Sequence, residues 1–301
     1  MTRVVRWTLV VPLLLILGLV ACGDDDDVRP TPTADTPGPT ATATLPPTET
    51  PSPAASPTAT PAAETIGLKV YFLRDEKVAA VLREVPATQA VGRAAMEELL
   101  RGPTLNEVET GLSSAIPEGT RLLGLDISGG VATVDLSSEY ESGGGSLSMM
   151  ARLAQVVYTL TQFSTVDAVS FRLDGKPVEV FGGEGILLDG PVDRSDFEDL
   201  TPAIFVDSPP QGATVSSPVR VTGTANTFEA VFQLNIVDRE GLIIAEAVAM
   251  ATSGSGTRGT FDVTIPFELE QPGAGAIIVF EESARDGSQV NVVEIPVNLE
   301  Q

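Results

Sequence analysis

The chain has 301 residues, long enough for two domains or one large one, and it carries 41 acidic against 18 basic side chains, a net charge of -23. This charge opposes contact with nucleic-acid phosphates and anionic lipid headgroups, so no nucleic-acid partner is expected. Histidine is absent and Cys22 is the single cysteine. These two facts exclude Ser-His-Asp and Cys-His catalysis, disulfides within the chain and thiolate zinc sites. We expect neither a cofactor nor a metal ion.

The N-terminus predicts an export signal followed by a lipid attachment site. Two arginines precede an apolar run over 9–20, which is short for a membrane-spanning helix of roughly 20 apolar residues. The motif Leu19-Val20-Ala21-Cys22 resembles the lipobox of bacterial lipoproteins. The resemblance implies that signal peptidase II removes residues 1–21 and that a diacylglycerol on Cys22 anchors the protein to the cell membrane, outside the cytoplasm. The alternative is an uncleaved anchor or a plain secretory signal.

The composition of residues 22–65 predicts a disordered tether. Four consecutive aspartates, Asp24 to Asp27, follow the lipid site, and residues 30–61 are rich in threonine and alanine and hold 10 of the chain's 23 prolines. Such a segment has almost none of the large apolar side chains whose burial offsets the entropy of ordering. Proline at this density favours extended polyproline II at ~3.1 Å per residue, so the tether can reach on the order of 100 Å. We expect it to hold the folded part away from the membrane.

Residues 66–200 predict an α+β domain in which two helices cover a small mixed sheet. Thr88 is the expected cap of the first helix, and Leu147, Met150, Ala154 and Val157 are the expected buried face of the second. The expected order is ββαββαββ, with strands at 66–73 and 78–85, a helix at 88–101, strands at 121–127 and 131–136, a helix at 146–163, and strands at 166–173 and 177–180.

Three motifs of this domain occur in the order that the GerMN (sporulation and spore germination) family has them. They are Gly102-Pro103-Thr104, Ser114-Ala115-Ile116-Pro117 and VATVDLS at 131–137. The domain resembles this family over nearly its whole length. The resemblance implies a fold like the ring-building modules of secretion-like assemblies. It also implies occurrence on bacterial envelope lipoproteins and a role in protein–protein association, and it supplies no catalytic residue.

Residues 203–300 predict an all-β immunoglobulin-like sandwich without the cysteine pair of antibody domains. Segments 208–238 and 280–299 resemble the immunoglobulin-like domain of bacterial spore germination, which often follows GerMN domains. That shared order strengthens both resemblances. Seven β-rich runs alternate with turn clusters, at 204–207, 219–224, 230–237, 242–250, 260–265, 276–281 and 290–297.

One candidate site in the first domain consists of acidic residues. Asp135, Glu139 and Glu141 lie near the glycine loop at 143–145. A pair of carboxylates, one with a raised pKa, can cleave a glycan if their spacing is suitable. No second acidic position is marked as the partner, and the more common arrangement is that such residues are solvated loop acids.

The second domain offers four candidate binding residues: Phe228, Phe280, Glu281 and Glu282. In the functional interpretation they form an edge that presents an aromatic side chain and carboxylates to a partner. In the alternative interpretation the two phenylalanines belong to the sandwich core, because the alternation along strands directs such side chains inward.

These features predict a non-enzymatic, lipid-anchored envelope protein that associates with another envelope protein or with the cell wall, in a setting related to sporulation or germination. The first alternative is a lipoprotein that binds peptidoglycan or cleaves its glycan through Asp135 or Glu139. The second alternative is an accessory subunit of an envelope signalling system.

Overall fold

The folded part begins with a β-hairpin. The computed structural model describes residues 64–183 and 185–301, so the signal segment, the lipobox with Cys22 and nearly all of the tether lie outside the described residues. Strand β1 (Thr65–Arg74) pairs antiparallel with β2 (Lys77–Pro86). The two residues between them, Asp75 and Glu76, have φ angles of 50° and 62°. Two positive φ angles define a type I′ turn, whose twist matches that of the flanking strands.

Two helices and a short strand follow this hairpin. They are α1 (Val91–Arg101), α2 (Leu105–Glu109) and β3 (Leu112–Ser113), and β3 completes a sheet of order β2-β1-β3. The prediction that Thr88 caps α1 is wrong. Its hydroxyl accepts a hydrogen bond from the Ala90 N–H, and this local turn delays the helix to Val91. Helix α2 was not predicted, because five residues are too few to show a helical periodicity.

Four further strands of the first domain form a second sheet, of order β4-β5-β6-β7, and β8 and β9 form a separate two-stranded sheet. The expected single sheet is therefore divided into three. β5 and β6 run parallel, and their crossover contains η1 (Ser138–Glu141) and α3 (Ser146–Leu160). The strand expected at 177–180 is divided between two short strands, and the Val178 N–H between them still bonds the Phe171 carbonyl at 3.1 Å. The strands are β4 (Leu122–Ser128), β5 (Val131–Leu136), β6 (Ala168–Leu173) and β7 (Lys176–Pro177), followed by the paired β8 (Val180–Phe181) and β9 (Ile186–Leu187).

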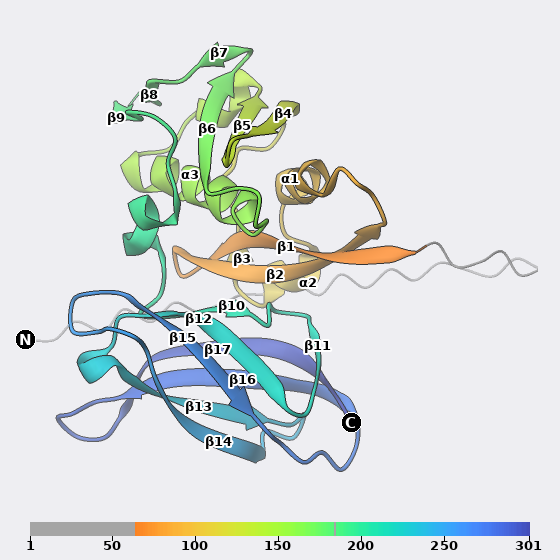
Figure 1. The fold of residues 1–301 in the computed structure, drawn as a ribbon, viewed down its shortest axis with the longest axis vertical. Coiled ribbons are helices and arrows are strands. Elements are labelled where there is room, and N and C mark those ends of the chain that lie inside the picture. The colour runs from red at the N-terminus through yellow and green to blue at the C-terminus, as the bar shows by residue number, and fades with distance from the viewer. Residues whose placement is uncertain (1–63, 184) are drawn as a thin grey trace, which may run out of the picture. The chain divides into compact units, whose positions relative to one another are not determined.

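Helix α3 lies between the β2-β1-β3 sheet and the β4-β5-β6-β7 sheet (Figure 1). All of its residues from 151 to 160 are buried, including three polar ones. Each of these polar side chains is satisfied: Thr159 and Gln155 bond the backbone of Tyr71, and Arg152 donates to three backbone carbonyls. The prediction that Leu147 belongs to the buried face is wrong. Its side chain is 49% exposed, since it lies in the first turn of the helix, directly after the surface glycine loop.

The second domain is a sandwich of two sheets, which confirms the predicted fold class. One sheet has the order β10-β12-β15 and the other β11-β17-β16-β13-β14. The core between them includes Phe232 and Phe261, whose rings meet edge to face with centroids 4.8 Å apart. The strands are β10 (Ile204–Ser208), β11 (Thr214–Ser216), β12 (Val219–Ala225), β13 (Val231–Val237), β14 (Ile243–Met250), β15 (Gly259–Ile265), β16 (Gly273–Glu282) and β17 (Gln289–Glu300).

Backbone contacts join the two domains, and both lie within one compact unit. The 3-10 helix η2 (Arg194–Leu200) leads into β10. Gln211, in the loop after β10, donates its N–H to the carbonyl of Ala80 and accepts from the N–H of Leu82, both at 2.9 Å. These bonds occupy part of the free edge of β2, so the second domain covers an edge that would otherwise expose unpaired backbone groups.

Candidate functional site

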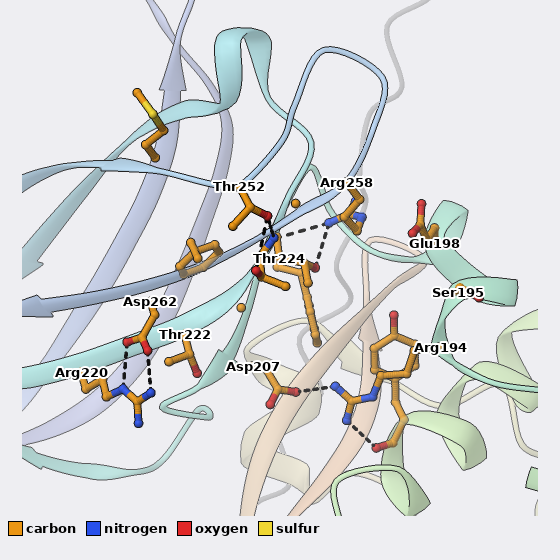
Figure 2. Close-up of a pocket in the computed structure, with 17 residues that line it drawn as sticks. Arg194, Ser195, Glu198, Asp207, Arg220, Thr222, Thr224, Thr252, Arg258 and Asp262 are labelled. Carbon is orange, nitrogen blue, oxygen red and sulfur yellow. Dashed lines mark hydrogen bonds and ion pairs between the residues drawn. The ribbon is translucent and has the colours of Figure 1, made fainter. Parts of the chain in front are cut away.

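A groove of about 970 Å³ lies between the three-stranded sheet of the second domain and η2 of the first (Figure 2). This volume is within the range of ligand sites in proteins. Its floor follows from strand alternation: along β12 and β15 the apolar side chains enter the core, and Thr222, Thr224, Thr260 and Asp262 face outward. Gly223 allows β10 to approach closely, since a Cβ there would lie 1.9 Å from the carbonyl oxygen of Phe205.

A charged cluster around Asp207 of β10 closes one side of the groove. Its carboxylate is ion-paired with Lys69, accepts the Tyr71 hydroxyl at 2.6 Å and lies 3.1 Å from the Arg194 guanidinium. Burial alone would raise the pKa of Asp207, but the charges of Arg194 and Lys69 hold it below its ordinary value. The carboxylate is therefore ionised, and it links strand β1 of the first domain to strand β10 of the second.

Two tyrosine rings hold the Arg194 guanidinium in place. It lies 4.6 Å from the ring centroid of Tyr158 and 5.4 Å from that of Tyr71. Desolvation raises the pKa of Tyr71 well above its ordinary value, with the Asp207 charge adding to the effect, and raises the pKa of Tyr158 to about 12. Both hydroxyls stay neutral in the physiological range, so this end of the groove is rigid and has no group ready for proton transfer.

Two further arginines line the groove (Figure 2). Arg220 forms a two-pronged ion pair with Asp262 at 2.8 and 2.5 Å, exposed to solvent. Arg258 instead donates to neutral oxygens, the Pro202 carbonyl at 2.9 Å and the Thr224 hydroxyl at 3.2 Å. Desolvation lowers the pKa of Arg258, but an arginine remains charged at neutral pH. The groove therefore combines threonine hydroxyls with one cation that pairs with no carboxylate among the described residues.

The structure separates the four candidate binding residues of the second domain. The Phe228 side chain is 60% exposed and that of Phe280 only 5%. Glu281 accepts the Phe228 N–H at 2.8 Å and the Asn291 side-chain amide at 2.9 Å, so it supports the loop that carries Phe228. Glu282 is exposed. Of the two phenylalanines, only Phe228 is available to a partner.

The loop around Phe228 is held firmly. Phe228 begins the short 3-10 helix η3 (Phe228–Ala230), and the next two residues, Glu229 and Ala230, have φ angles of 55° and 62°. The Ser255 hydroxyl accepts the Glu229 N–H at 3.0 Å. A Cβ on Gly254 would lie 2.5 Å from the Ala230 nitrogen. The exposed ring therefore projects from a strained, closely packed turn, a combination that often accompanies function.

The acidic candidates of the first domain do not form a carboxylate pair poised for catalysis. Asp135 accepts the Gly175 N–H at 2.9 Å and so supports the β6–β7 turn. Hydrogen bonding from Ser137 lowers the pKa of Glu139, and Arg121 lies 3.8 Å from its carboxylate. Glu141 is exposed. The general acid of a glycosidase needs a raised pKa. The pKa of Glu139 is lowered, which is the opposite of what that role requires.

Within residues 64–183 and 185–301, no group of three or more His, Cys, Asp and Glu residues is arranged to hold a metal ion. No helix in the same ranges is long and apolar enough to cross a membrane.

Sequence reasoning missed the groove and its charged residues. Asp207, Arg194 and Arg258 lie in unrelated segments and match no motif. A weak signal was present: basic residues are rare in this chain, and Arg258 follows a glycine- and serine-rich turn at the start of a strand. Only the folded chain brings these side chains together.

The chain matches two protein-family models. The first is described as sporulation and spore germination and matches residues 69–179; the second, the immunoglobulin-like domain of bacterial spore germination, matches residues 203–288. Both predicted resemblances are confirmed. No curated protein matches the chain.

Three solved structures are similar to parts of the chain. The tandem GerMN domains of the sporulation protein GerM from Bacillus subtilis are 19% identical, over 67% of this chain and 62% of that one, with a TM-score of 0.41. The first GerMN domain of the same protein is 25% identical over 44% of this chain and 100% of that one, at 0.39. A putative lipoprotein from Clostridium perfringens is 24% identical over 46% and 93%, at 0.33. This chain spans less than two thirds of the tandem-domain structure.

The order of the two matched segments agrees with the order of the two folds along the chain. The first segment covers most of the α+β domain around α3, and the second covers most of the sandwich. The chain therefore carries a sporulation and spore germination domain at residues 69–179, followed by an immunoglobulin-like domain of bacterial spore germination at residues 203–288.

Proposed function

We propose that this protein is a non-enzymatic, lipid-anchored component of the bacterial cell envelope, whose two domains bind a partner as one unit. The observation that carries the proposal is the groove, which is lined by residues of both domains. The Asp207 cluster joins the domains beside it. A partner in this groove contacts a preformed surface and loses little free energy to ordering the protein.

The character of the two domains and of the groove supports binding over catalysis. Neither domain family is known as an enzyme family. Asp207 and Asp262 in the groove both have lowered pKa values: burial opposes the shift at Asp207 but the charges of Arg194 and Lys69 outweigh it, and the hydrogen bond from Arg220 lowers the pKa of Asp262. Carboxylates in this state accept hydrogen bonds but do not donate protons at neutral pH. The groove is therefore suited to holding a ligand in place.

The lipid anchor is the second part of the proposal. Cleavage after Ala21 would leave Cys22 as the first residue, with the acidic and proline-rich segment between the lipid and the folded domains. The measurement is the intact mass of the native protein extracted from membranes. We expect a mass that lacks residues 1–21 and includes a diacylglycerol. Cys22→Ser should move the protein from the membrane fraction to the soluble fraction. An unmodified Cys22 would contradict this part.

Association is tested by crosslinking from inside the groove. A photoreactive residue replaces Thr222 on the groove floor, and a matched replacement of Thr214, an exposed threonine on β11, is the control. In living cells we expect a defined protein or wall-fragment adduct from position 222 that is absent from position 214. The same adducts from both positions, or none from either, would count against a binding role for the groove.

A further inference from the structure

Arg258 differs from the other two arginines of the groove. Arg194 pairs with Asp207, and Arg220 pairs with Asp262. Among the described residues no ion pair includes Arg258, so no carboxylate oxygen lies within 4.0 Å of its nitrogens. Desolvation lowers the pKa of Arg258, and Tyr158 and the exposed carboxylate of Glu198 act against this effect from longer range. Arg258 is therefore a half-buried cation whose surroundings do not neutralise it by direct contact.

The bonds that Arg258 makes leave part of its guanidinium available. The Pro202 carbonyl and the oxygens of Thr224 accept from its two terminal nitrogens. A guanidinium carries five N–H donors in a planar fork, so donors remain for a further acceptor. The fork geometry matches a carboxylate, and such charge-assisted bonds are about twice as strong as neutral ones. Because Pro202 and Thr224 hold the side chain, little rotamer freedom is lost when an anion binds.

The rest of the groove offers neutral polar contacts. Within the described part of the chain, the outward-facing hydroxyl of Thr222 has no hydrogen-bond partner, and Thr260 and Thr252 share a weak hydroxyl contact of 3.4 Å. Hydroxyls both donate and accept, as the amides and sugar hydroxyls of a polar polymer require. The three arginines of the groove are balanced by Glu198, Asp207 and Asp262, so the groove lacks the excess negative charge of the whole chain.

We propose that the groove binds a free carboxylate of a peptidoglycan stem peptide, with Arg258 as the charged donor and the threonine floor contacting the adjoining amides and sugars. This inference rests on the proposed function and names its ligand. A single polymer chain enters a groove of about 970 Å³, whereas a folded acidic protein would approach against the net charge of -23.

The experiment measures binding of muropeptides, released from purified wall by a muramidase, to the full mature protein in detergent, by titration calorimetry. The same muropeptides with their carboxylates amidated provide a test that needs no change to the protein. Losing a charge-assisted contact weakens binding by about 10- to 100-fold. We expect amidation of the ligand and Arg258→Gln each to weaken binding by at least about tenfold. Arg285→Gln, which removes an exposed arginine elsewhere on the sandwich, should leave it within about twofold.

The outcomes separate this inference from the proposed function. Equal affinity for free and amidated muropeptides would overturn the carboxylate contact, as would full affinity in a folded Arg258→Gln variant. No measurable muropeptide binding would overturn the ligand assignment. If the Thr222 position then crosslinks to a defined protein, the groove is a protein-binding site and the proposed function stands. If it crosslinks to nothing, both fail.

Discussion

The Asp207 cluster gives the sharpest test of how the two domains are joined. Asp207→Asn keeps the shape of the side chain but leaves Lys69 and Arg194 without their shared anion. Removing one partner from a buried ion pair costs about 3–5 kcal/mol. The Asp207 side chain is 24% exposed, and solvent screening reduces the expected loss to about 2–3 kcal/mol. For a folded part of this size, that corresponds to a Tm lower by about 4–12 °C.

The assay is thermal and urea unfolding of the chain without residues 1–21 and with Cys22→Ser. The single tryptophan of the chain is Trp7, so no tryptophan signal remains. Circular dichroism reports the loss of structure. Two of the three tyrosines, Tyr71 and Tyr158, contact Arg194, so the near-ultraviolet signal reports the junction. Asp262→Asn is the matched control, because its pair with Arg220 is exposed and solvent screening leaves it little effect on stability.

The pH dependence has a definite sign. The pKa of Asp207 is lowered in the folded state, so its contribution is fully present above the ordinary aspartate pKa of about 3.9 and is lost as the pH falls through the folded-state value. The stability difference between the two proteins should be constant at neutral pH and shrink below about pH 4. A loss under about 0.5 kcal/mol at pH 7, or one equal to that of Asp262→Asn, would refute the assigned role.

Three further predictions concern burial and packing. Phe280→Ala should destabilise the protein by about 3–5 kcal/mol because Phe280 is buried, whereas Phe228→Ala should change stability by less than about 0.5 kcal/mol. Denaturant unfolding measures both losses, and equal losses would contradict the assigned exposures. Gly223→Ala should lower the Tm sharply or prevent folding, since its Cβ would meet the Phe205 carbonyl at 1.9 Å, whereas Gly183→Ala meets nothing within 4 Å and serves as the control. The pKa values of Tyr71, Tyr140 and Tyr158 are all raised, chiefly by desolvation. Their contribution to stability is fully present below the ordinary tyrosine pKa of about 10 and is lost as the pH rises through the folded-state values. Tyrosinate absorbance should therefore appear together with unfolding and not near pH 10.

Local pattern was enough to predict the hairpins and the type of each domain. The alternation of VATVDL predicted β5 with its bounds, Val131–Leu136, and the two glycines before it have the positive φ angles that a two-residue turn requires. The β-rich runs of the second domain all became strands. The sequence pattern did not predict the elements that are only a few residues long. Strand β11 has three residues and joins the edge of β17 in parallel, a pairing that depends on the docked sheet.

The exposure of the candidate residues depended on tertiary structure. Phe280 falls inside the β-rich run predicted at 276–281, whereas Phe228 lies just before the run predicted at 230–237, where strand alternation does not specify which way a side chain faces. The left-handed conformations at Glu229 and Ala230 belong to a turn that turns Phe228 out to solvent. These conformations persist because the Ser255 loop packs against the turn, and its position is set by strands far along the chain.

The sequence by itself determined the net charge, the absence of histidine, the periodicities that define the elements and the two family resemblances, because each of these is a property of residue type and short spacing. The groove and the domain junction were decided only by the tertiary structure. Lys69 and Asp207 are 138 positions apart, and alternation specifies which face of a strand each occupies but not which side chain it meets. That pairing forms when the two domains dock, since a buried carboxylate stays ionised only if cations lie beside it.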